Sequence, residues 1–298
     1  MNSDIINNNT VGILLAGGLG SRMYPSTKSI SKHLLPLYDK PIIYYSFSIL
    51  LLAGIKNIII ISSREDTNNY KKIFGNGSQL GIKIKYLIQN KPNGIAEALL
   101  IAKKYIISKK VVLMLGDNFI HGHGLPDLIT ESICLGKSII FGHRVSNPKD
   151  YGVAKFNSQN KLIKIIEKPK KPPSDLAVIG LYIFGPDWIN FINKIKPSKR
   201  NELEITDLNN LMIKDKKMEL VEFGRGFYWM DCGTPENLLK TSIYVQNIQE
   251  RQNTIIACIE EIVFRNKWIS INQYKKLINL SKNSAYKKYL ESTLKLLS

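Results

Sequence analysis

The chain has 298 residues, a mass of 33.8 kDa, a hydrophobic share of 44% and a formal net charge of +18 at pH 7. This length allows one large α/β domain or two small ones, and the composition predicts an ordered core. The longest nearly apolar run, residues 42–55, falls short of the ~20 residues that span a bilayer, and the polar start of the chain lacks the pattern of a signal peptide. We therefore expect a cytoplasmic protein without a membrane partner, and the three isolated cysteines suit that reducing compartment (Cys134, Cys232 and Cys258).

A large net positive charge is also typical of nucleic-acid-binding proteins. Its lysines, however, occur as scattered pairs such as Lys71–Lys72 and Lys287–Lys288, and not as one arginine-rich stripe. Solvated surface lysine explains the charge better, so we expect no nucleic-acid partner. A positive field still attracts an anionic substrate.

Apolar runs of strand length alternate with longer helical patterns. Strands are predicted at Val11–Ala16, Asn57–Ser62, Lys83–Ile88, Val111–Leu115, Ser138–His143, Val153–Asn157, Leu162–Glu167 and Val178–Phe184. Helices are predicted at Ile42–Ala53, Thr67–Phe74, Gly94–Ile107, Leu125–Cys134 and Pro186–Ile195, and the chain is mainly helical after Thr234. The alternation favours parallel βαβ units, and residues 158–160 predict the turn of an inserted hairpin. We expect an α/β domain over residues 10–240 and a helical segment over residues 241–298, packed on that domain or on a neighbouring subunit.

The stretch GILLAGGLGSRMYP begins as a strand and continues into a glycine turn that ends in cations. Such a turn lets backbone N–H groups face phosphate oxygens. A dinucleotide fingerprint would continue with a third glycine and a helix, and the P-loop pattern is absent. Here Arg22 follows the glycines and Lys32 lies further on. The glycines alone fit an ordinary tight turn equally well.

Two apolar runs end in an aspartate. VLMLGDN carries Asp117 and FYWMDCGT carries Asp231. Because strand ends gather at one edge of an open α/β sheet, we expect the two carboxylates to converge there. Mg²⁺ takes one or two carboxylates and leaves its other positions to water and phosphate. Each aspartate alone could instead cap a helix or a turn.

The stretch IIEKPKKPP places Glu167 and Lys168 at a strand end. Glu167 can accept hydrogen bonds from sugar hydroxyls, and Lys168 can hold a phosphate as a point charge. An exposed strand end followed by a proline-stiffened loop explains these residues as well, and the residues alone favour that explanation.

Several motifs, taken in chain order, show that the sequence resembles a known family. These are GILLAGGLGSRMYP, SKHLLPLYDKPIIYYSFSILLLAGI, LGDN, YGV, EKP, RNELEITDLN, GRGFYWMDCGT and ERQNTIIACIEEI. From about Val11 to Leu290 the chain resembles the bacterial glucose-1-phosphate thymidylyltransferases. The resemblance implies a single Rossmann-like nucleotidyltransferase domain, with a mixed and mostly parallel central sheet, an inserted β-hairpin and C-terminal helices. It also implies Mg²⁺ as cofactor, a homotetramer, and the reaction of dTTP with α-D-glucose 1-phosphate to dTDP-glucose and pyrophosphate, the first step toward dTDP-rhamnose and related sugars.

The resemblance also assigns roles by position. Arg22 and Lys32 match the catalytic cations, and Asp117 and Asp231 match the metal ligands. The nucleotide-binding positions are Gly18, Gly20, Ser21, Arg22, Lys32, Gln89, Pro92 and Gly94. The sugar-phosphate-binding positions are Asn118, Gly152, Glu167, Lys168 and Val178. The amide of Gln89 can pair with the donor–acceptor edge of thymine or uracil.

The chain departs from the family pattern at several positions, and two other functions stay open. Ser21 stands for a usual Thr, His33 and Glu97 for Gln, Cys232 for Thr or Ser, Leu176 for Tyr, and Ala285 and Lys287 for Gly. With the departures at His33, Glu97, Ala285 and Lys287, the sequence does not determine the affinity for the nucleotide or whether feedback by the product is retained.

One alternative function is a sugar-1-phosphate uridylyltransferase that uses UTP, because a missing methyl group is worth only ~1–3 kcal/mol. The other is a non-catalytic sugar-nucleotide-binding protein.

Overall fold

The structure, a computed structural model, describes residues 9–198 and 200–297. In that range the strands are β1 (Thr10–Ala16), β2 (Pro36–Leu37), β3 (Lys40–Pro41), β4 (Asn57–Ser62), β5 (Lys83–Ile88), β6 (Lys110–Leu115), β7 (Asn118–His121), β8 (Ser138–Arg144), β9 (Gly152–Phe156), β10 (Leu162–Glu167), β11 (Leu176–Phe184), β12 (Met218–Glu222) and β13 (Tyr228–Asp231). The α-helices are α2 (Ile42–Leu52), α3 (Thr67–Phe74), α4 (Glu97–Ile106), α5 (Leu125–Cys134), α6 (Ile189–Ile192), α7 (Ile205–Lys214), α8 (Pro235–Gln252), α9 (Ile259–Arg265), α10 (Ile271–Leu280) and α11 (Ala285–Leu297).

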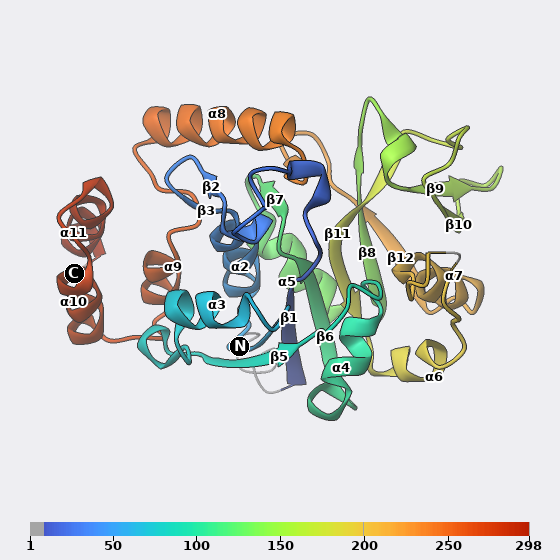
Figure 1. Cartoon of the computed structure of the whole chain (residues 1–298), viewed down its shortest axis with the longest axis horizontal. Coiled ribbons are helices and arrows are strands. Elements are labelled where there is room, and N and C mark those ends of the chain that lie inside the picture. The colour runs from blue at the N-terminus through green and yellow to red at the C-terminus, as the bar shows by residue number, and fades with distance from the viewer. Residues whose placement is uncertain (1–8, 199, 298) are drawn as a thin grey trace.

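The described strands form one nine-stranded mixed sheet and two two-stranded ribbons. Strands β5, β4, β1 and β6 lie parallel and adjacent in that order. Strand β11 continues the sheet antiparallel to β6, and it also pairs with β8 and β9. Strand β12 joins β8, and β9 with β10 forms the inserted hairpin. Figure 1 shows this sheet in the middle of the molecule. The predicted α/β class with a mixed, mostly parallel central sheet is confirmed.

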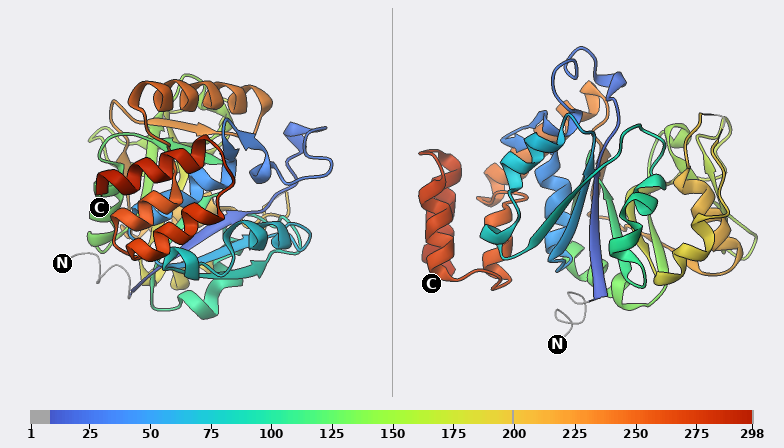
Figure 2. Two further views of the ribbon diagram at one scale, coloured as in Figure 1. Left: turned by 90° about the vertical axis from the view of Figure 1, so that its left-hand side faces the viewer. Right: turned by 60° about the horizontal axis from the view of Figure 1, so that its bottom comes forward.

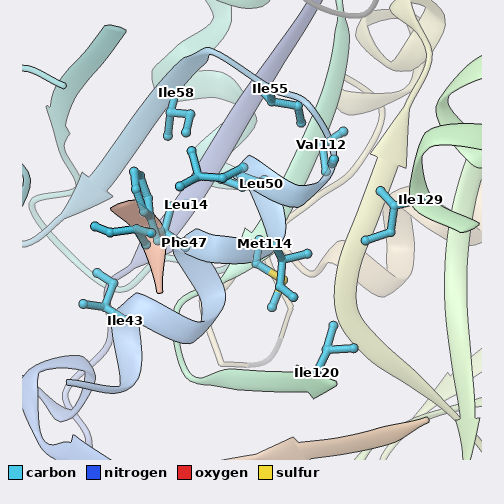
Figure 3. Packing of buried hydrophobic residues seen from close by; sticks show 14 of the residues in the cluster. Leu14, Ile43, Phe47, Leu50, Ile55, Ile58, Val112, Met114, Ile120 and Ile129 are labelled. Carbon is cyan, nitrogen blue, oxygen red and sulfur yellow. The ribbon is translucent and has the colours of Figure 1, made fainter. Parts of the chain in front are cut away.

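Strand residues alternate between two apolar cores, one on each face of the sheet. In β1, Leu14 belongs to the core built with α2, α3, α5 and α9, while Ile13 and Leu15 belong to the core built with α4, α6 and α7. Helices therefore cover both faces of the parallel strands, which is why these strands are nearly continuous apolar runs. Figure 3 shows the first core, in which Phe47 and Leu50 of α2 pack beside Leu14.

The predicted strands are all present, with ends within two residues of the prediction. Helices α2, α3 and α5 also agree within one residue. Helix α4 begins later than predicted because Gly94 has φ 106° and the Ala96 N–H donates to the Leu203 carbonyl at 3.2 Å. The helix predicted at residues 186–195 is a 3₁₀ turn followed by the short α6. Strands β2, β3, β7 and β12 and helix α7 have no predicted counterpart, and β13 matches only the apolar run that ends in Asp231. Strands of two to five residues show too little alternation to be recognised.

The C-terminal region is helical, as the sequence predicts. Helix α8 contacts β2 and β13, α9 packs on α2, and α10 and α11 pair with each other and with α9. Figures 1 and 2 show α10 and α11 at one end of the molecule, away from the inserted hairpin. Phe264 of α9 stacks on Tyr274 of α10, with 4.2 Å between ring centroids. The expected boundary at residue 240 falls inside α8, and the division into two parts stays a prediction.

The helices of the described residues all fall short of the length or the apolarity that crossing a membrane requires.

Candidate active site

A cavity of about 410 Å³ opens where the parallel strands β1 and β6 end, the edge at which open α/β sheets bind ligands. Most of the predicted site residues line it: Gly18, Arg22, Lys32, Gln89, Pro92, Gly94, Asn118, Gly152, Glu167, Lys168, Val178 and Asp231. Gly20, Ser21 and Asp117 are not lining residues. Gly20 and Ser21 belong to the turn that carries Arg22, and Asp117 is buried, where it pairs with Lys32. The predicted nucleotide and sugar-phosphate residues therefore meet at one cavity.

Two contacts fix the glycine loop after β1. Gly20 has a left-handed conformation (φ 60°), and a Cβ there would lie 2.9 Å from Thr27 Cγ2. Thr27 Oγ1 donates to the Gly20 carbonyl at 2.9 Å. The 3₁₀ turn that follows, Ser21–Met23, buries Met23. Between these anchors Arg22 lines the cavity with a side chain that is 58% exposed.

A small ribbon, and not the edge of the central sheet, brings the two aspartates together. Strand β13 pairs antiparallel with β7 so that Asp231 lies opposite Asn118. The Cys232 N–H donates to the Asp117 carbonyl at 2.9 Å. The expectation that both aspartates end strands of one open sheet is therefore wrong for Asp231, because β13 belongs to a separate two-stranded sheet. Their convergence is nevertheless as expected.

Each of the two cations pairs with one carboxylate. Lys32 Nζ donates to Asp117, and Arg22 Nη2 donates to Asp231 Oδ2 at 3.3 Å. Burial raises the pKa of Asp117, but the nearby positive charge, chiefly that of Lys32, and the hydrogen bonds from Lys32 and Asn118 together outweigh burial and hold this pKa below its usual value. For Asp231, burial and the nearby charge of Asp117 raise the pKa. Burial lowers the pKa of Lys32, but the charge and the hydrogen bond of Asp117 together with the charge of Asp231 more than compensate, so the pKa of Lys32 is raised. The two carboxylates therefore lie within electrostatic reach of each other.

The aspartate pair fits a magnesium ion. Within residues 9–198 and 200–297, no group of three or more His, Cys, Asp or Glu side chains could hold a metal, so a cation here would rely on two protein carboxylates. That number is typical of Mg²⁺, which fills its other positions with water and phosphate. Among the described side chains, Asp231 Oδ1 is one of the few buried oxygens without a hydrogen-bond partner. A divalent cation would satisfy this oxygen.

Asn118 links three elements beside the aspartates. Its Oδ1 accepts hydrogen bonds from Trp229 Nε1 at 2.7 Å and from the Gly180 N–H at 3.0 Å. Its Nδ2 donates to Asp117 Oδ1 at 3.1 Å. A Cβ on Gly180 would lie 2.6 Å from Asn118 Oδ1, so only glycine permits this approach. The contacts suit Asn118 for orienting Asp117, and its predicted contact with the sugar phosphate stays a prediction.

The predicted base-binding residues lie between β5 and α4. Gln89 is buried, and its Nε2 donates to the Gly94 carbonyl at 3.1 Å and to Glu97 Oε2 at 2.7 Å. A Cβ on Gly94 would lie 2.4 Å from the Leu203 carbonyl oxygen. The Leu203 N–H donates to the Asn93 carbonyl at 2.7 Å. The chain before α7 therefore clamps this loop in one shape.

The predicted sugar-phosphate residues come mainly from the inserted hairpin. Gly152 pairs with Glu167 across the hairpin, and a Cβ on Gly152 would lie 3.2 Å from Glu167 Oε2. Thr206 Oγ1 donates to the same oxygen at 2.7 Å. Lys168 has φ 42°, and its N–H donates to the Tyr151 carbonyl at 3.0 Å. These contacts hold Glu167 and Lys168 at the cavity wall.

The cavity also contains residues to which the sequence analysis assigned no individual role. They are Gly17, Asp150, Tyr151, Tyr182, Arg200, Glu202, Glu204, Thr206, Asn209 and Trp229, among others. Several of them belong to the stretch RNELEITDLN, in which Arg200 pairs with Glu204 at 2.9 Å. The charged residues of this stretch, one arginine followed by three acidic residues, are a visible signal, but their spacing does not show that the stretch folds against the cavity.

Two departures from the family pattern lie beside the aspartates. His33 is 1% exposed, and its Nδ1 lies 3.0 Å from Ser31 Oγ. Burial, with a smaller contribution from the charge of Lys32, lowers the pKa of His33 to about 3. Cys232 is also buried, and burial raises the pKa of its thiol. Both side chains are therefore uncharged at neutral pH.

Comparison with known proteins defines the class. A sequence model of the nucleotidyl transferase family matches residues 11–247. A glucose-1-phosphate thymidylyltransferase of Neisseria meningitidis is 42% identical over 285 residues, which cover 95% of this chain and 99% of that protein. One of Mycobacterium tuberculosis is 37% identical over 279 residues, which cover 94% of this chain and 97% of that protein. The chain therefore belongs to the nucleotidyl transferase family.

Solved structures agree with this assignment. A crystal structure from Bacillus anthracis, with sucrose bound, of a protein assigned as a glucose-1-phosphate thymidylyltransferase is 35% identical, with a TM-score of 0.72 over 79% of this chain and 94% of that chain. A UDP-glucose pyrophosphorylase in complex with UDP-glucose is 25% identical, with a TM-score of 0.70 over 80% of this chain and 99% of that chain.

Proposed function

We propose that this protein transfers a thymidylyl group from dTTP to α-D-glucose 1-phosphate, giving dTDP-glucose and pyrophosphate. Relatives named glucose-1-phosphate thymidylyltransferase match almost the whole chain at 37–42% identity. The product would supply dTDP-rhamnose and related sugars. A uridylyltransferase that uses UTP is the second candidate, and the likeness to UDP-glucose pyrophosphorylase supports it more weakly.

The reaction joins two polyanions. A phosphate monoester is largely dianionic near neutral pH because its second pKa is ~6, so the sugar phosphate is already a nucleophile and needs no general base. One of its oxygens forms a bond to the α-phosphorus of dTTP, and the bond from that phosphorus to the bridging oxygen of the leaving pyrophosphate breaks. The protein must align these groups and neutralise the charge of the leaving group.

Arg22 and Lys32 are our candidates for that electrostatic work. Arg22 lines the cavity and is more than half exposed, so its guanidinium can reach a phosphate by a change of rotamer. Lys32 also lines the cavity, and its raised pKa keeps it charged throughout the neutral range. At the reacting phosphorus these positive charges would offset the negative charge that develops in the transition state.

Asp117 and Asp231 are our candidates for holding Mg²⁺. When bound, this ion would neutralise charge on the triphosphate and on the leaving pyrophosphate. Asn118 would orient Asp117, and Arg22 and Lys32 would turn from the carboxylates to the phosphates.

The remaining roles complete the proposal. Gln89, Pro92 and Gly94 would surround the base, and Glu167 and Lys168 would hold the sugar and its phosphate. Gly18, Gly20 and Ser21 would shape the triphosphate loop, and Gly152 and Val178 would complete the sugar side.

We also propose a homotetramer in the cytoplasm, and the three free cysteines suit a reducing compartment.

One observation carries the proposal: in a chain of this family, Arg22 and Lys32 line one cavity, where Arg22 pairs with Asp231 and Lys32 pairs with the buried Asp117. The test is to incubate the purified protein with dTTP, glucose 1-phosphate and MgCl₂. We expect dTDP-glucose and pyrophosphate in equal amounts, and Arg22→Met should lose most of this turnover. A folded protein that binds dTTP but forms no dTDP-glucose would contradict the proposal.

A further inference from the structure

The amide of Gln89 is held in one orientation. Both hydrogens of its Nε2 have acceptors, the Gly94 carbonyl at 3.1 Å and Glu97 Oε2 at 2.7 Å. A carbonyl and a carboxylate can only accept hydrogen bonds, so the NH₂ group must face them. Gln89 Oε1 therefore lies on the other side, 2.9 Å from where a Cβ on Gly17 would be. Gln89 and Gly17 both line the cavity, so the amide offers an oxygen on the side of the glycine loop.

Glu97 is itself fixed in place. Its second oxygen, Oε1, accepts a hydrogen bond from Asn93 Nδ2 at 2.9 Å. Glu97 is also the first residue of α4, where a negative charge is favourable. In the described part of the chain, the residues that line the cavity include Gln89 but not Glu97. Glu97 is therefore not expected to contact a nucleotide directly, and its hydrogen bond to Gln89 links it to a residue that lines the cavity.

We propose that Glu97 is a positioning residue that makes Gln89 present only an acceptor to the base, and thereby selects bases with an N3–H. The proposal rests on the nucleotide site proposed above. Thymine and uracil carry this hydrogen, whereas cytosine has a lone pair at N3 that would face the lone pairs of Gln89 Oε1. Glu97 therefore contributes to the rejection of cytosine, and it does not distinguish thymine from uracil. In this arrangement Gln89 recognises only the donor of the donor–acceptor edge of the base, and not the acceptor beside it.

A glutamine at position 97 would weaken this constraint. Its amide can turn either its oxygen or its NH₂ toward Gln89, so the Gly94 carbonyl alone would then hold the Gln89 NH₂ group, and Gln89 would face the base with a donor more often than in the wild type. Glu97→Gln thus keeps the size of the side chain, removes its charge and weakens the hold on the orientation of Gln89. Glu97→Leu removes both acceptor oxygens, and it serves as a second variant with the same expected direction.

The experiment compares dTTP with 5-methyl-dCTP, which keeps the methyl group and the deoxyribose and differs at N3 and C4. Values of kcat/KM are measured with saturating glucose 1-phosphate for the wild type, both Glu97 variants and Glu131→Gln. Glu131 is exposed on α5 and is a matched control for the loss of a carboxylate. In both Glu97 variants we expect the preference for dTTP to fall about tenfold, the worth of one neutral hydrogen bond. We expect KM to rise for dTTP and to fall for 5-methyl-dCTP, with kcat for dTTP nearly unchanged.

A crossed change of this kind cannot come from structural damage, which would impair both nucleotides alike. Glu131→Gln should leave the preference unchanged. A wild-type preference that persists in both Glu97 variants would overturn the inference. If the wild type binds nucleotides without turnover, the proposed function fails separately, and the ratio of the two dissociation constants from calorimetry applies the same test to Glu97.

Discussion

Lys32 donates a hydrogen bond to Asp117 across 85 positions of the sequence, and the two side chains are only 15% and 11% exposed. The pair joins the loop after β1 to the turn after β6, so it ties the proposed triphosphate loop to the proposed metal site. Because both groups are nearly removed from water, neither charge is well solvated without the other.

The first prediction concerns this pair and protein stability. Lys32→Met leaves the Asp117 carboxylate buried without its partner, and such a loss costs about 3–5 kcal/mol. The double variant Lys32→Met/Asp117→Asn should regain most of this stability because no buried charge is left unpaired. Urea denaturation of the wild type, Lys32→Met, Asp117→Asn and the double variant measures the effect. Losses that simply add in the double variant would contradict the account.

The second prediction concerns the metal. Asp117→Asn and Asp231→Asn keep the shape of each side chain and remove its charge, so we expect each to fold and to lose about 100-fold or more in turnover. The double variant should be little worse than either single variant, because both act through one ion. A chelator should silence the wild type, and added Mg²⁺ should restore it. Near wild-type turnover of either single variant at limiting Mg²⁺ would contradict the shared site.

The third prediction concerns Lys168, which lines the cavity. Lys168→Ala should raise KM for glucose 1-phosphate about 10- to 100-fold, the worth of one charged hydrogen bond. The dissociation constant of dTTP should change little. Lys170→Ala is the matched control, since Lys170 is exposed and is not among the cavity residues. An equal loss of affinity for dTTP would mean that Lys168 serves the nucleotide and not the sugar phosphate.

The fourth prediction concerns stability and pH. The pKa of His33 is about 3 in the folded protein and ordinarily 6.5, so the unfolded chain takes up the proton first as the pH falls. The contribution of the buried, neutral His33 to the free energy of unfolding is therefore lost as the pH falls from about 6.5 to about 3. Between pH 7 and pH 5 the wild type should lose about 2 kcal/mol more than His33→Gln, which lacks this titration. Urea denaturation at the two pH values measures this, and an identical loss in both proteins would show that His33 is not the cause.

The sheet could be predicted because its signals are local. Strands β1, β4 and β6 are apolar runs set between recognisable helices, and their burial on both faces explains the pattern. The edge strand β5 is instead an alternating run of exposed and half-buried residues. The convergence of Asp117 and Asp231 was also predicted, but for the wrong reason. It depends on the pairing of β7 with β13, and two four-residue strands leave no periodic trace.

The finer parts of the site could not be predicted, because they depend on contacts between distant segments. The loop that carries Gly94 owes its shape to Leu203 before α7. The orientation of the Gln89 amide depends on Glu97, a residue that sequence reasoning noted only as a departure from the family pattern. The sequence shows neither contact, and both emerge when the segments pack together.

The most direct test of the central claim is a competition assay. Equal amounts of dTTP, UTP, CTP, GTP and ATP are mixed with glucose 1-phosphate, MgCl₂ and the protein, and the sugar nucleotides formed are separated and quantified. The account predicts dTDP-glucose as the main product, UDP-glucose at about one-tenth of it or less because the methyl group is worth ~1–3 kcal/mol, and only traces of the others. A mixture dominated by UDP-, CDP-, GDP- or ADP-glucose, or one without any sugar nucleotide, would contradict the account.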